Sequence, residues 1–249
     1  MPFAALFAVA LIRGHIDPQP ALWLQPDGQV TVQGRAVNPI FSPGTRKINT
    51  GNGVAFDFDG KRSGILLGDI PALQITDSMT ISVWLNLRSY VNDGPGAQIL
   101  FRGDDRCGLD PYSLVIEGNQ TVNFGVSEAN GHGMKLTAEI ALNKWTHVQS
   151  SFDAENHKLD LWINGEHVAF VKTSAAPFGF LDNGYTPGVS IGNVQNEKGP
   201  HNQPINGQIG DLRVYRGAFS PDDLGIRLGS WFEPPRTQTG SLPSHHTKA

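Results

Sequence analysis

The segment KWTHVQSSFDAENHKLDLWINGEHVAF, residues 144–170, contains two runs of alternating residues on either side of a polar turn. Its second run ends at Asn164-Gly165, a dipeptide typical of a two-residue type I′ hairpin turn. Apolar residues occupy one face of that run, and polar residues with a tryptophan occupy the other. The first face holds Leu159, Leu161 and Ile163, and the second holds Lys158, Asp160 and Trp162. This pattern predicts antiparallel strands with one face buried and the other available to water or a ligand.

The same alternation recurs along most of the chain and predicts further short strands between Gly, Pro and Asn turns. The expected strands cover residues 30–32, 54–59, 65–67, 80–87, 97–102, 112–117, 120–126, 135–142, 189–192 and 208–215. One short C-terminal helix is expected to begin at Ser220-Pro221-Asp222-Asp223 and to end near Gly229, because serine caps helices and proline suits their first position. Without helical crossovers, the pattern predicts an all-β fold, a two-sheet antiparallel β-sandwich or jelly roll with that helix.

A chain of 249 residues suits one all-β domain with an ample core. We expect an apolar N-terminal segment over residues 1–20, the sandwich over 21–230, and a disordered tail or linker over 231–249. The net charge of -4 and the lack of a Lys/Arg cluster predict no nucleic-acid partner. The single cysteine, Cys107, leaves no intrachain disulfide to form, which decides little about the compartment.

The apolar run from Phe3 to Ile12 is too short to span a bilayer, so no membrane-spanning segment is expected. Its length matches the apolar region of a signal peptide, but a basic start and a clear cleavage site are missing. Secretion, a wrongly assigned start codon and a cut within a longer protein all stay open as explanations.

Four segments, which together cover most of residues 50–226, resemble the laminin G-like and concanavalin A-like lectin jelly rolls. Besides the central hairpin, they are GVAFDFDGKRSGILL (53–67), MTISVWLNL (79–87) and SIGNVQNEKGPHNQPINGQIGDLRVYRGAFSPDDL (190–224). The last is similar to the family's C-terminal motif through Asn206-Gly207-x-Ile209-x-Asp211-x-Arg213-x-Tyr215. One departure is that Gly210 stands where many members have an aspartate directly after the isoleucine, which allows a register shift of one residue. Because this fold hosts lectins, adhesion modules and hydrolases, the resemblance implies the fold rather than one activity.

The resemblance implies calcium as a candidate cofactor, held by an acid of the last strand together with groups near an early Asp-Gly turn. On this chain those groups are Asp59, the carbonyl of Gly60, and Asp211, which alternation places on the outward face. Calcium takes six to eight oxygen ligands, so two carboxylates alone are far from a full shell. The alternative is that Asp59 caps its own turn and Asp211 pairs with Arg213 or with solvent.

A carbohydrate site pairs an aromatic ring with side chains that hydrogen-bond hydroxyl groups. Candidates on outward faces or in loops are Tyr90, Tyr112, Asn130, His132, Trp162 and Tyr185. Packing beneath loops is the alternative for the tryptophans. The loop from Gly103 to Pro111 is the densest charge cluster, and it is interpreted as a solvated turn more readily than as a metal or sugar loop.

The chain is expected not to be an enzyme. Laminarinase-like relatives carry Glu-x-Asp-x-x-Glu on one strand, and this spacing is absent, as are a nucleophile elbow and a His-Glu-x-x-His helix. The main hypothesis is a non-catalytic recognition module for glycans or glycoproteins, displayed outside the cytoplasm or on the cell surface. The second is a structural or protein-adhesion domain of a longer surface protein, and a glycoside hydrolase is third.

Overall fold

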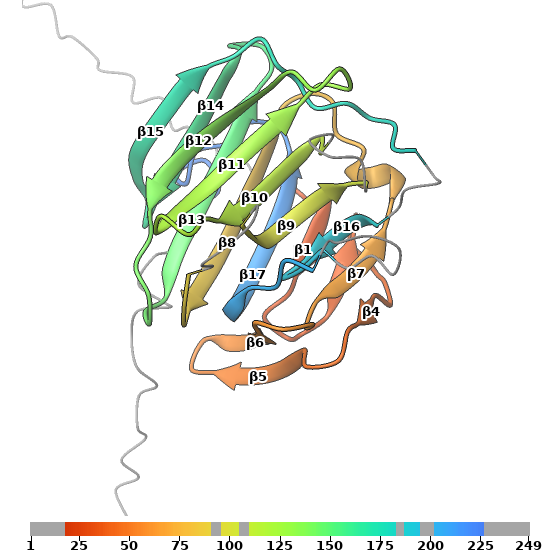
Figure 1. Ribbon diagram of the computed structural model, residues 1–249, viewed down its shortest axis with the longest axis vertical. Coiled ribbons are helices and arrows are strands. Elements are labelled where there is room, and N and C mark those ends of the chain that lie inside the picture. Colours follow the sequence, from red (N-terminus) through yellow and green to blue (C-terminus); the bar gives the residue numbers. More distant parts are fainter. Residues whose placement is uncertain (1–17, 91–95, 105–109, 183–186, 195–201, 227–249) are drawn as a thin grey trace, which may run out of the picture.

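Two antiparallel sheets packed face to face form the body of the molecule (Figure 1). The computed structural model describes residues 18–90, 96–104, 110–182, 187–194 and 202–226. The first sheet contains β1 (Leu22–Leu24), β2 (Val30–Val32), β3 (Arg35–Ala36), β5 (Arg46–Thr50), β6 (Gly53–Asp59), β8 (Met79–Leu87), β13 (Thr146–Asp153), β14 (Lys158–Ile163), β15 (Glu166–Lys172) and β17 (Asn206–Arg216). The second contains β4 (Ile40–Phe41), β7 (Ile65–Gly68), β9 (Ala97–Gly103), β10 (Tyr112–Ile116), β11 (Thr121–Ser127), β12 (Gly133–Glu139) and β16 (Gly188–Ile191).

The ten-stranded sheet runs in the order β15-β14-β13-β8-β17-β1-β2-β3, with β6 paired to β17 and β5 paired to β6. The seven-stranded sheet runs in the order β12-β11-β10-β9-β16-β7-β4 and lies in front in Figure 1. All strand pairs are antiparallel, and strands distant in sequence lie side by side, as β8 and β17 do. The predicted all-β, two-sheet antiparallel sandwich is therefore confirmed.

The core lies between the sheets and consists of the alternate apolar residues that the sequence pattern singled out. On β8 these are Ile81, Val83, Leu85 and Leu87, all buried in the core cluster. Burial of such side chains stabilises the fold by about 25 cal/mol for each Å² of apolar surface removed from water. Every second residue of a strand thereby faces outward, and those outward residues form the two faces on which a ligand can bind.

Turn chemistry sets the strand register at two hairpins. Asn164 and Gly165 have φ values of 52° and 78°, as the predicted type I′ turn between β14 and β15 requires. The turn between β10 and β11 has three residues, 118–120, and not the predicted two. Glu117 N donates to Thr121 O across this loop, and Gln120 has a φ of 71°. A residue in the left-handed region closes this three-residue loop.

The expected C-terminal helix is a hydrogen-bonded turn over residues 221–225 in the part of the chain that is described. Its capping pair is present: Ser220 Oγ donates to Asp223 Oδ2 at 2.7 Å, and Asp223 N donates back to Ser220 Oγ at 3.3 Å. The expected continuation to Gly229 lies outside the described residues, as do residues 1–17 and the expected tail. A short 3₁₀ helix at Pro71–Leu73 was not predicted. Among the residues with described placement, no helix is long and apolar enough to cross a bilayer.

Candidate functional site

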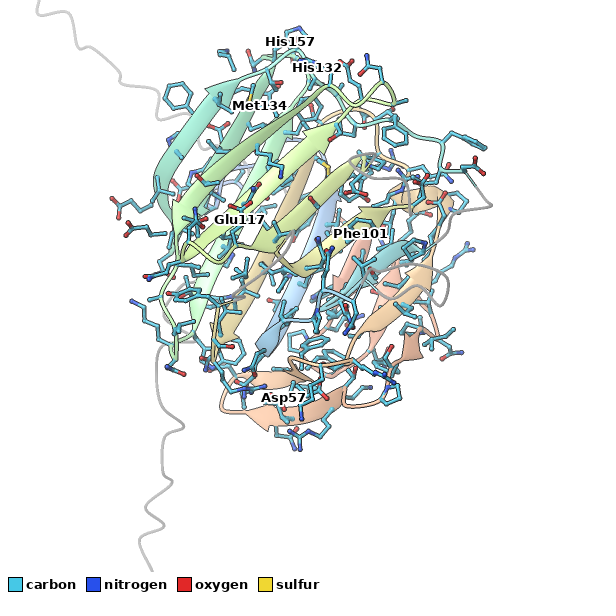
Figure 2. All side chains as sticks on the ribbon, in the orientation of Figure 1. Asp57, Phe101, Glu117, His132, Met134 and His157 are labelled. Carbon is cyan, nitrogen blue, oxygen red and sulfur yellow. The ribbon has the colours of Figure 1, made fainter. Side chains whose placement is uncertain are left out.

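A cavity of about 540 Å³ opens on the outer face of the seven-stranded sheet, over β9 to β12. Tyr112, Leu114 and Ile116 of β10 point into the core, so the intervening Ser113 and Val115 face outward into the cavity. The lining comprises Gln98, Phe101, Asp104, Asp110, Ser113, Val115, Asn123, Gly125, Val126, Ser127, Gly131, Gly133, Met134, Lys135, Val194 and Gln203. Figure 2 views this face and labels Phe101, Glu117 and Met134 around it. Apolar surface interrupted by a few polar groups is typical of a small-molecule site.

Gly125 makes part of the cavity floor hollow. A Cβ atom added there would meet Lys135, Ser113 and Met134 at 3.6–3.8 Å, which is ordinary contact. Its φ lies outside the left-handed region, so a larger side chain fits the strand without backbone strain. The cavity at this point therefore depends on the missing side chain, and a substitution at Gly125 can fill it without breaking β11.

Two acids, Asp104 and Asp110, lie at one end of the cavity. Asp104 is buried and accepts a hydrogen bond from Asp182 N at 3.3 Å. Burial first, and then the charge of Asp104, raises the pKa of Asp110 to about 7, although Lys135 acts in the opposite direction. The carboxyl group of Asp110 is therefore poised to gain or lose a proton near neutral pH.

Three amide side chains, those of Gln98, Asn123 and Gln203, also line the cavity. Gln98 is buried, and its Nε2 donates to Gln203 Oε1 at 2.7 Å, while its backbone N donates to Gln203 O at 2.9 Å. The Oε1 atom of Gln98 is itself buried and has no hydrogen-bond partner among the residues whose placement is described. Asn123 Nδ2 donates to Glu117 Oε1 at 2.6 Å, which fixes the orientation of that amide on β11. The lining thus combines oriented amide side chains with apolar surface.

The six predicted sugar-contacting residues do not form one site. Tyr112 is fully buried and donates from its hydroxyl to Leu73 O at 2.7 Å, so its prediction as an accessible ligand residue is wrong. Burial raises the pKa of this hydroxyl further above its ordinary value. Tyr90 is half-buried against the core and donates to Ile140 O at 2.5 Å. Tyr185 lies outside the described residues.

Asn130 and His132 are exposed in the turn between β11 and β12, at the rim next to Gly131 and Gly133 of the cavity lining. Asn130 Oδ1 accepts from His132 N at 2.8 Å, and both side chains contact Glu128. They lie close to the cavity but are not part of its lining.

Trp162 lies on the opposite side of the sandwich, on the outer face of the ten-stranded sheet. Its ring packs 5.1 Å from that of His167, which stacks 6.2 Å from Phe170, and we call these three residues the aromatic row. The Oδ1 atom of the buried Asp160 lies 2.8 Å from His167 Nε2, and this polar contact orients the histidine ring. Phe170 is 64% exposed. Trp162 therefore belongs to a second surface, separate from the cavity.

Trp84 of β8 supports the packing alternative. Trp84 is 3% exposed and lies 5.1 Å from the ring of His147, which is fully buried. His147 Nε2 lies 2.9 Å from Ser82 Oγ. Burial, aided by the charge of Arg213, lowers the pKa of His147 to about 3, so the ring is neutral at physiological pH.

The expected calcium ligands are not brought together. Asp59 lies opposite Asn206 in the pairing of β6 with β17, and Asp211 lies five residues further along β17. At about 3.3 Å per residue, that separation is roughly 16 Å, far more than one ion's coordination shell spans. Within the described residues, no group of three or more His, Cys, Asp or Glu side chains is placed to hold a metal. Calcium binding stays a prediction from resemblance, but the proposed pairing of these two acids is wrong.

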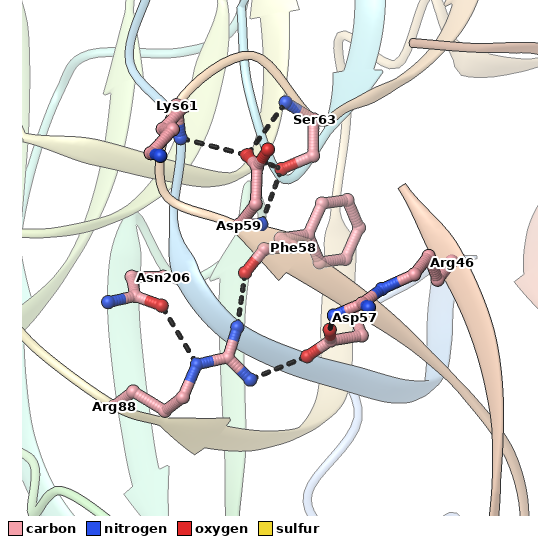
Figure 3. A network of polar contacts seen from close by, with 8 residues as sticks. All are labelled: Arg46, Asp57, Phe58, Asp59, Lys61, Ser63, Arg88 and Asn206. Atoms are coloured by element: carbon pink, nitrogen blue, oxygen red, sulfur yellow. Dashed lines mark hydrogen bonds and ion pairs between the residues drawn. The ribbon is translucent and has the colours of Figure 1, made fainter. Parts of the chain in front are cut away.

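Asp59 caps its own turn, as the alternative interpretation expected (Figure 3). Its Oδ1 accepts from Lys61 N, Ser63 N and Ser63 Oγ at 2.9, 3.2 and 2.8 Å. Burial opposes ionisation, but these hydrogen bonds outweigh it and lower the pKa of Asp59 to about 2. Oδ1 is thus already well supplied with donors.

Figure 3 also shows an arginine clamp on the neighbouring acid, Asp57. Arg88 and Arg46 contact its two carboxylate oxygens at 2.5 and 2.7 Å. Burial opposes ionisation here too, but the hydrogen bonds from Arg88 and then Arg46 keep the pKa of Asp57 below its ordinary value. Arg88 also donates to Phe58 O and to Asn206 Oδ1 at 2.5 and 2.8 Å, so it links β6, β8 and β17 at one end of the sheet.

Asp211 pairs with Arg213, again as the alternative expected. Arg213 Nε donates to Asp211 Oδ1 at 2.7 Å, and Trp23 Nε1 donates to the same oxygen at 2.7 Å. A β-bulge causes this arrangement: Gly210 pairs with Trp84 and Arg213 with Ser82, so β17 uses three steps where β8 uses two. The bulge lies at the position where Gly210 departs from the family motif, and the one-residue register shift against that motif stays a prediction.

The charged loop from Gly103 to Pro111 contributes its two ends to the cavity, through Asp104 and Asp110, while residues 105–109 lie outside the described part. The cavity residues Gln98, Phe101, Asn123, Gly125, Lys135 and Gln203 were missed from the sequence. Outward parity was the available signal for Asn123, Gly125 and Lys135, since they alternate with core residues on β11 and β12.

The chain resembles several solved toxin domains in structure. The botulinum neurotoxin serotype D binding domain is 16% identical with a TM-score of 0.65, over 88% of this chain and 56% of that one. A botulinum neurotoxin type C structure, whose cell entry depends on two ganglioside molecules, is 14% identical with a TM-score of 0.63, over 86% and 51%. The binding domain of Paraclostridial Mosquitocidal Protein 1 is 12% identical with a TM-score of 0.63, over 86% and 52%. This chain thus spans about half the length of each, and likeness at this identity shows the fold alone.

A search of the curated proteins gave no match. The model of the concanavalin A-like lectin/glucanase superfamily, in its laminin G form, matches residues 59–225. That span includes every strand from β7 to β17 and agrees with the two-sheet sandwich described above. The chain therefore belongs to the concanavalin A-like lectin/glucanase superfamily.

Proposed function

We propose that this chain is a non-catalytic recognition module that binds glycans, free or on glycoproteins, in the cavity over β9 to β12. The observation that carries the proposal is the lining itself, in which oriented polar side chains border apolar surface. A pyranose ring has apolar C–H faces and a rim of hydroxyl donors, so it matches both kinds of surface. Phe101 supplies aromatic surface, and Gln98, Asn123 and the two acids supply polar partners.

The same proposal places the module outside the cytoplasm, where glycans of cells and matrices are displayed. Toxin domains of similar fold support it: one is the binding domain of a mosquitocidal protein, one belongs to a toxin whose cell entry depends on two ganglioside molecules, and one was solved in complex with SialylT. Those ligands are properties of the toxins. A lectin role on this chain rests on its own cavity.

The aromatic row is the second candidate location for the same function. Its three rings and the buried Asp160 resemble a stacking platform with one fixed polar group. We favour the cavity, because it surrounds a ligand on several sides and provides more hydrogen-bonding groups than the row does.

The test is binding to an array of neutral, acidic and amino glycans, compared between the wild-type chain and single variants. Gly125→Val fills the cavity floor with a β-branched residue suited to a strand, and we expect at least a tenfold loss of binding. Thr137→Val is the matched control, since this exposed residue lies on the outward face of the neighbouring strand outside the cavity. Phe170→Ala tests the aromatic row, with Phe180→Ala as its control, since Phe180 is another exposed phenylalanine and lies outside the row.

Loss of binding in Gly125→Val alone supports the cavity, whereas loss in Phe170→Ala alone moves the site to the aromatic row. Well-folded protein that binds no glycan contradicts the lectin proposal and leaves the protein-adhesion alternative. Hydrolysis of a laminarin-type glucan would instead establish the enzyme alternative.

A further inference from the structure

The seven-stranded sheet ends at β12, and no strand of the described residues pairs with its outer edge. β12 pairs with β11 over residues 133–139 in continuous register, without a bulge. His132 O accepts from the amide of residue 128, and Ile140 N donates to the carbonyl of residue 120, so the even-numbered residues direct their backbone groups toward β11. By alternation, the odd-numbered residues, such as Thr137 and Glu139, direct theirs to the open side, where a further strand can pair.

The neighbouring edge of the ten-stranded sheet, β15, is less suited to pairing with another strand. Leu161 pairs with Ala169 and Trp162 pairs with His167, which leaves Val168 as an extra residue in a bulge. A bulge interrupts the row of backbone groups and protects an edge against strand addition. On this side of the sandwich, β12 is therefore the edge that an extended chain can join.

A groove runs beside the open edge of β12. Figure 1 shows β12 at the border of the front sheet, over β14 and β15 of the rear sheet, and the three strands lie against one another. Between them is a pocket of about 400 Å³, and a second pocket of the same volume adjoins it at Glu139, Ile163 and Asn164. We call the first pocket the edge groove; it is bordered by residues 137–139 of β12 and by Ile163, Asn164, Glu166 and Val168 of the β14–β15 hairpin.

The edge groove combines apolar surface with two acids. Ala138 and Ile163 are half-buried and pack against the core, while Val168 is 42% exposed. Glu139 and Glu166 are exposed, and no basic side chain belongs to the described lining of this groove. An exposed ion pair contributes only about 0.2–1 kcal/mol, so burial of apolar surface and backbone pairing would supply most of the affinity. The two carboxylates set a preference for a basic occupant.

We propose that the edge groove binds an extended, basic peptide segment of a partner protein, which pairs with β12 as an eighth strand of that sheet. Successive side chains of a strand point to opposite faces. Every second side chain of the peptide therefore contacts the apolar surface around Val168, and lysine or arginine lies near Glu139 or Glu166. Main-chain hydrogen bonds give such an added strand affinity, and the alternate side chains give it specificity. This surface is separate from the glycan cavity, so the inference does not depend on the proposed function.

The test begins with selection of random heptapeptides, displayed on phage, on the whole chain. We expect the enriched peptides to alternate apolar and basic residues. For a synthetic enriched peptide, Glu166→Lys and Val168→Ser should each weaken binding at least fivefold in fluorescence polarisation. Glu155→Lys, an exposed acid in the turn before β14, and Phe170→Ser, on the opposite face of β15, are the matched controls and should leave binding unchanged.

Methylation of the peptide's own amides separates strand addition from other modes of binding. Only every second amide of an added strand faces β12. Methylation of one alternate set should therefore abolish binding, whereas methylation of the other set should change it by less than about threefold.

Four results overturn the inference. They are a selection without enrichment, enriched peptides that lack the alternation, equal losses in the variants and their controls, and two methylated sets that behave alike. Loss of peptide binding in Gly125→Val would place the peptide in the glycan cavity and would also overturn it. None of these results bears on glycan binding, so failure here is distinguishable from failure of the proposed function.

Discussion

Asp110 destabilises the folded chain at neutral and alkaline pH, and its replacement by asparagine should relieve that cost. Burial and the charge of Asp104 raise the pKa of Asp110 from 3.8 to about 7. Between these two pH values the folded state holds a proton that the unfolded state has released. Stability therefore falls as the pH rises through this window, and the full cost is present above pH 7.

The magnitude follows from the width of the window. About three pH units at ~1.4 kcal/mol each give an upper limit of ~4 kcal/mol for a fully buried carboxyl group. Asp110 is only partly buried in the structure, so solvent screening reduces this figure, and we expect ~2 kcal/mol. For a domain of this size, that difference corresponds to a shift of roughly 4–8 °C in the unfolding midpoint.

The assay is denaturant or thermal unfolding of the wild type and Asp110→Asn at pH 4 and pH 8, with Glu139→Gln as the exposed-acid control. The asparagine variant should be more stable at pH 8 and should approach the wild type at pH 4, while the control shows no such trend. A variant that is less stable at pH 8, or a difference independent of pH, would refute the reasoning. The expected result also has a functional meaning, since a residue that costs stability in a cavity is typical of a binding site.

Four further outcomes are expected. Asp211→Asn should lower the free energy of unfolding by about 1–3 kcal/mol through weakened charge-assisted hydrogen bonds, by equal amounts with millimolar calcium and with chelator, as differential scanning calorimetry can show. Tyr112→Phe should cost about 1 kcal/mol in urea unfolding and leave glycan binding unchanged, because the hydroxyl lies in the core. Gly192→Ala should lower the thermal unfolding midpoint far more than Gly68→Ala. The two glycines have similar φ values, +76° and +74°, but only at Gly192 does an added Cβ meet a phenylalanine ring; equal midpoints would contradict this. The neutral, buried His147, with its pKa lowered to about 3, should cost stability as the pH falls below 6.5, and His147→Gln should flatten that decline in an acid titration.

Strand identity and side-chain parity could be predicted because they depend on neighbours along the chain. The β14–β15 hairpin follows from an Asn-Gly turn and a two-residue period, and both appear in the structure. Side-chain parity could also have placed Tyr112 in the core, since Tyr112 is two residues before the apolar Leu114 and therefore lies on the same face of β10. That error came from choosing residues by side-chain type and not by face.

Pairings between distant segments could not be predicted in the same way. The bulge at Gly210–Arg213 turns Asp211 toward Trp23, which is 188 residues away in sequence, and away from any site shared with Asp59. The cavity likewise needs β9, β10, β11 and β12 side by side, with Gln203 brought to β9 by backbone pairing. No local pattern encodes these distances.

The sequence alone determined the fold class of this chain, a β-sandwich that resembles the laminin G-like and concanavalin A-like domains. It could do so because strand periodicity and turn residues act over only a few positions along the chain. Only the tertiary structure decided which outward residues share a surface: it separated Trp162 from Asn130 and His132, buried Tyr112, and grouped Asp104, Asp110 and Gln98 around one cavity. The physical reason is that sheet order, register and bulges are set by packing of the whole core, and a ligand site is a property of those long-range contacts.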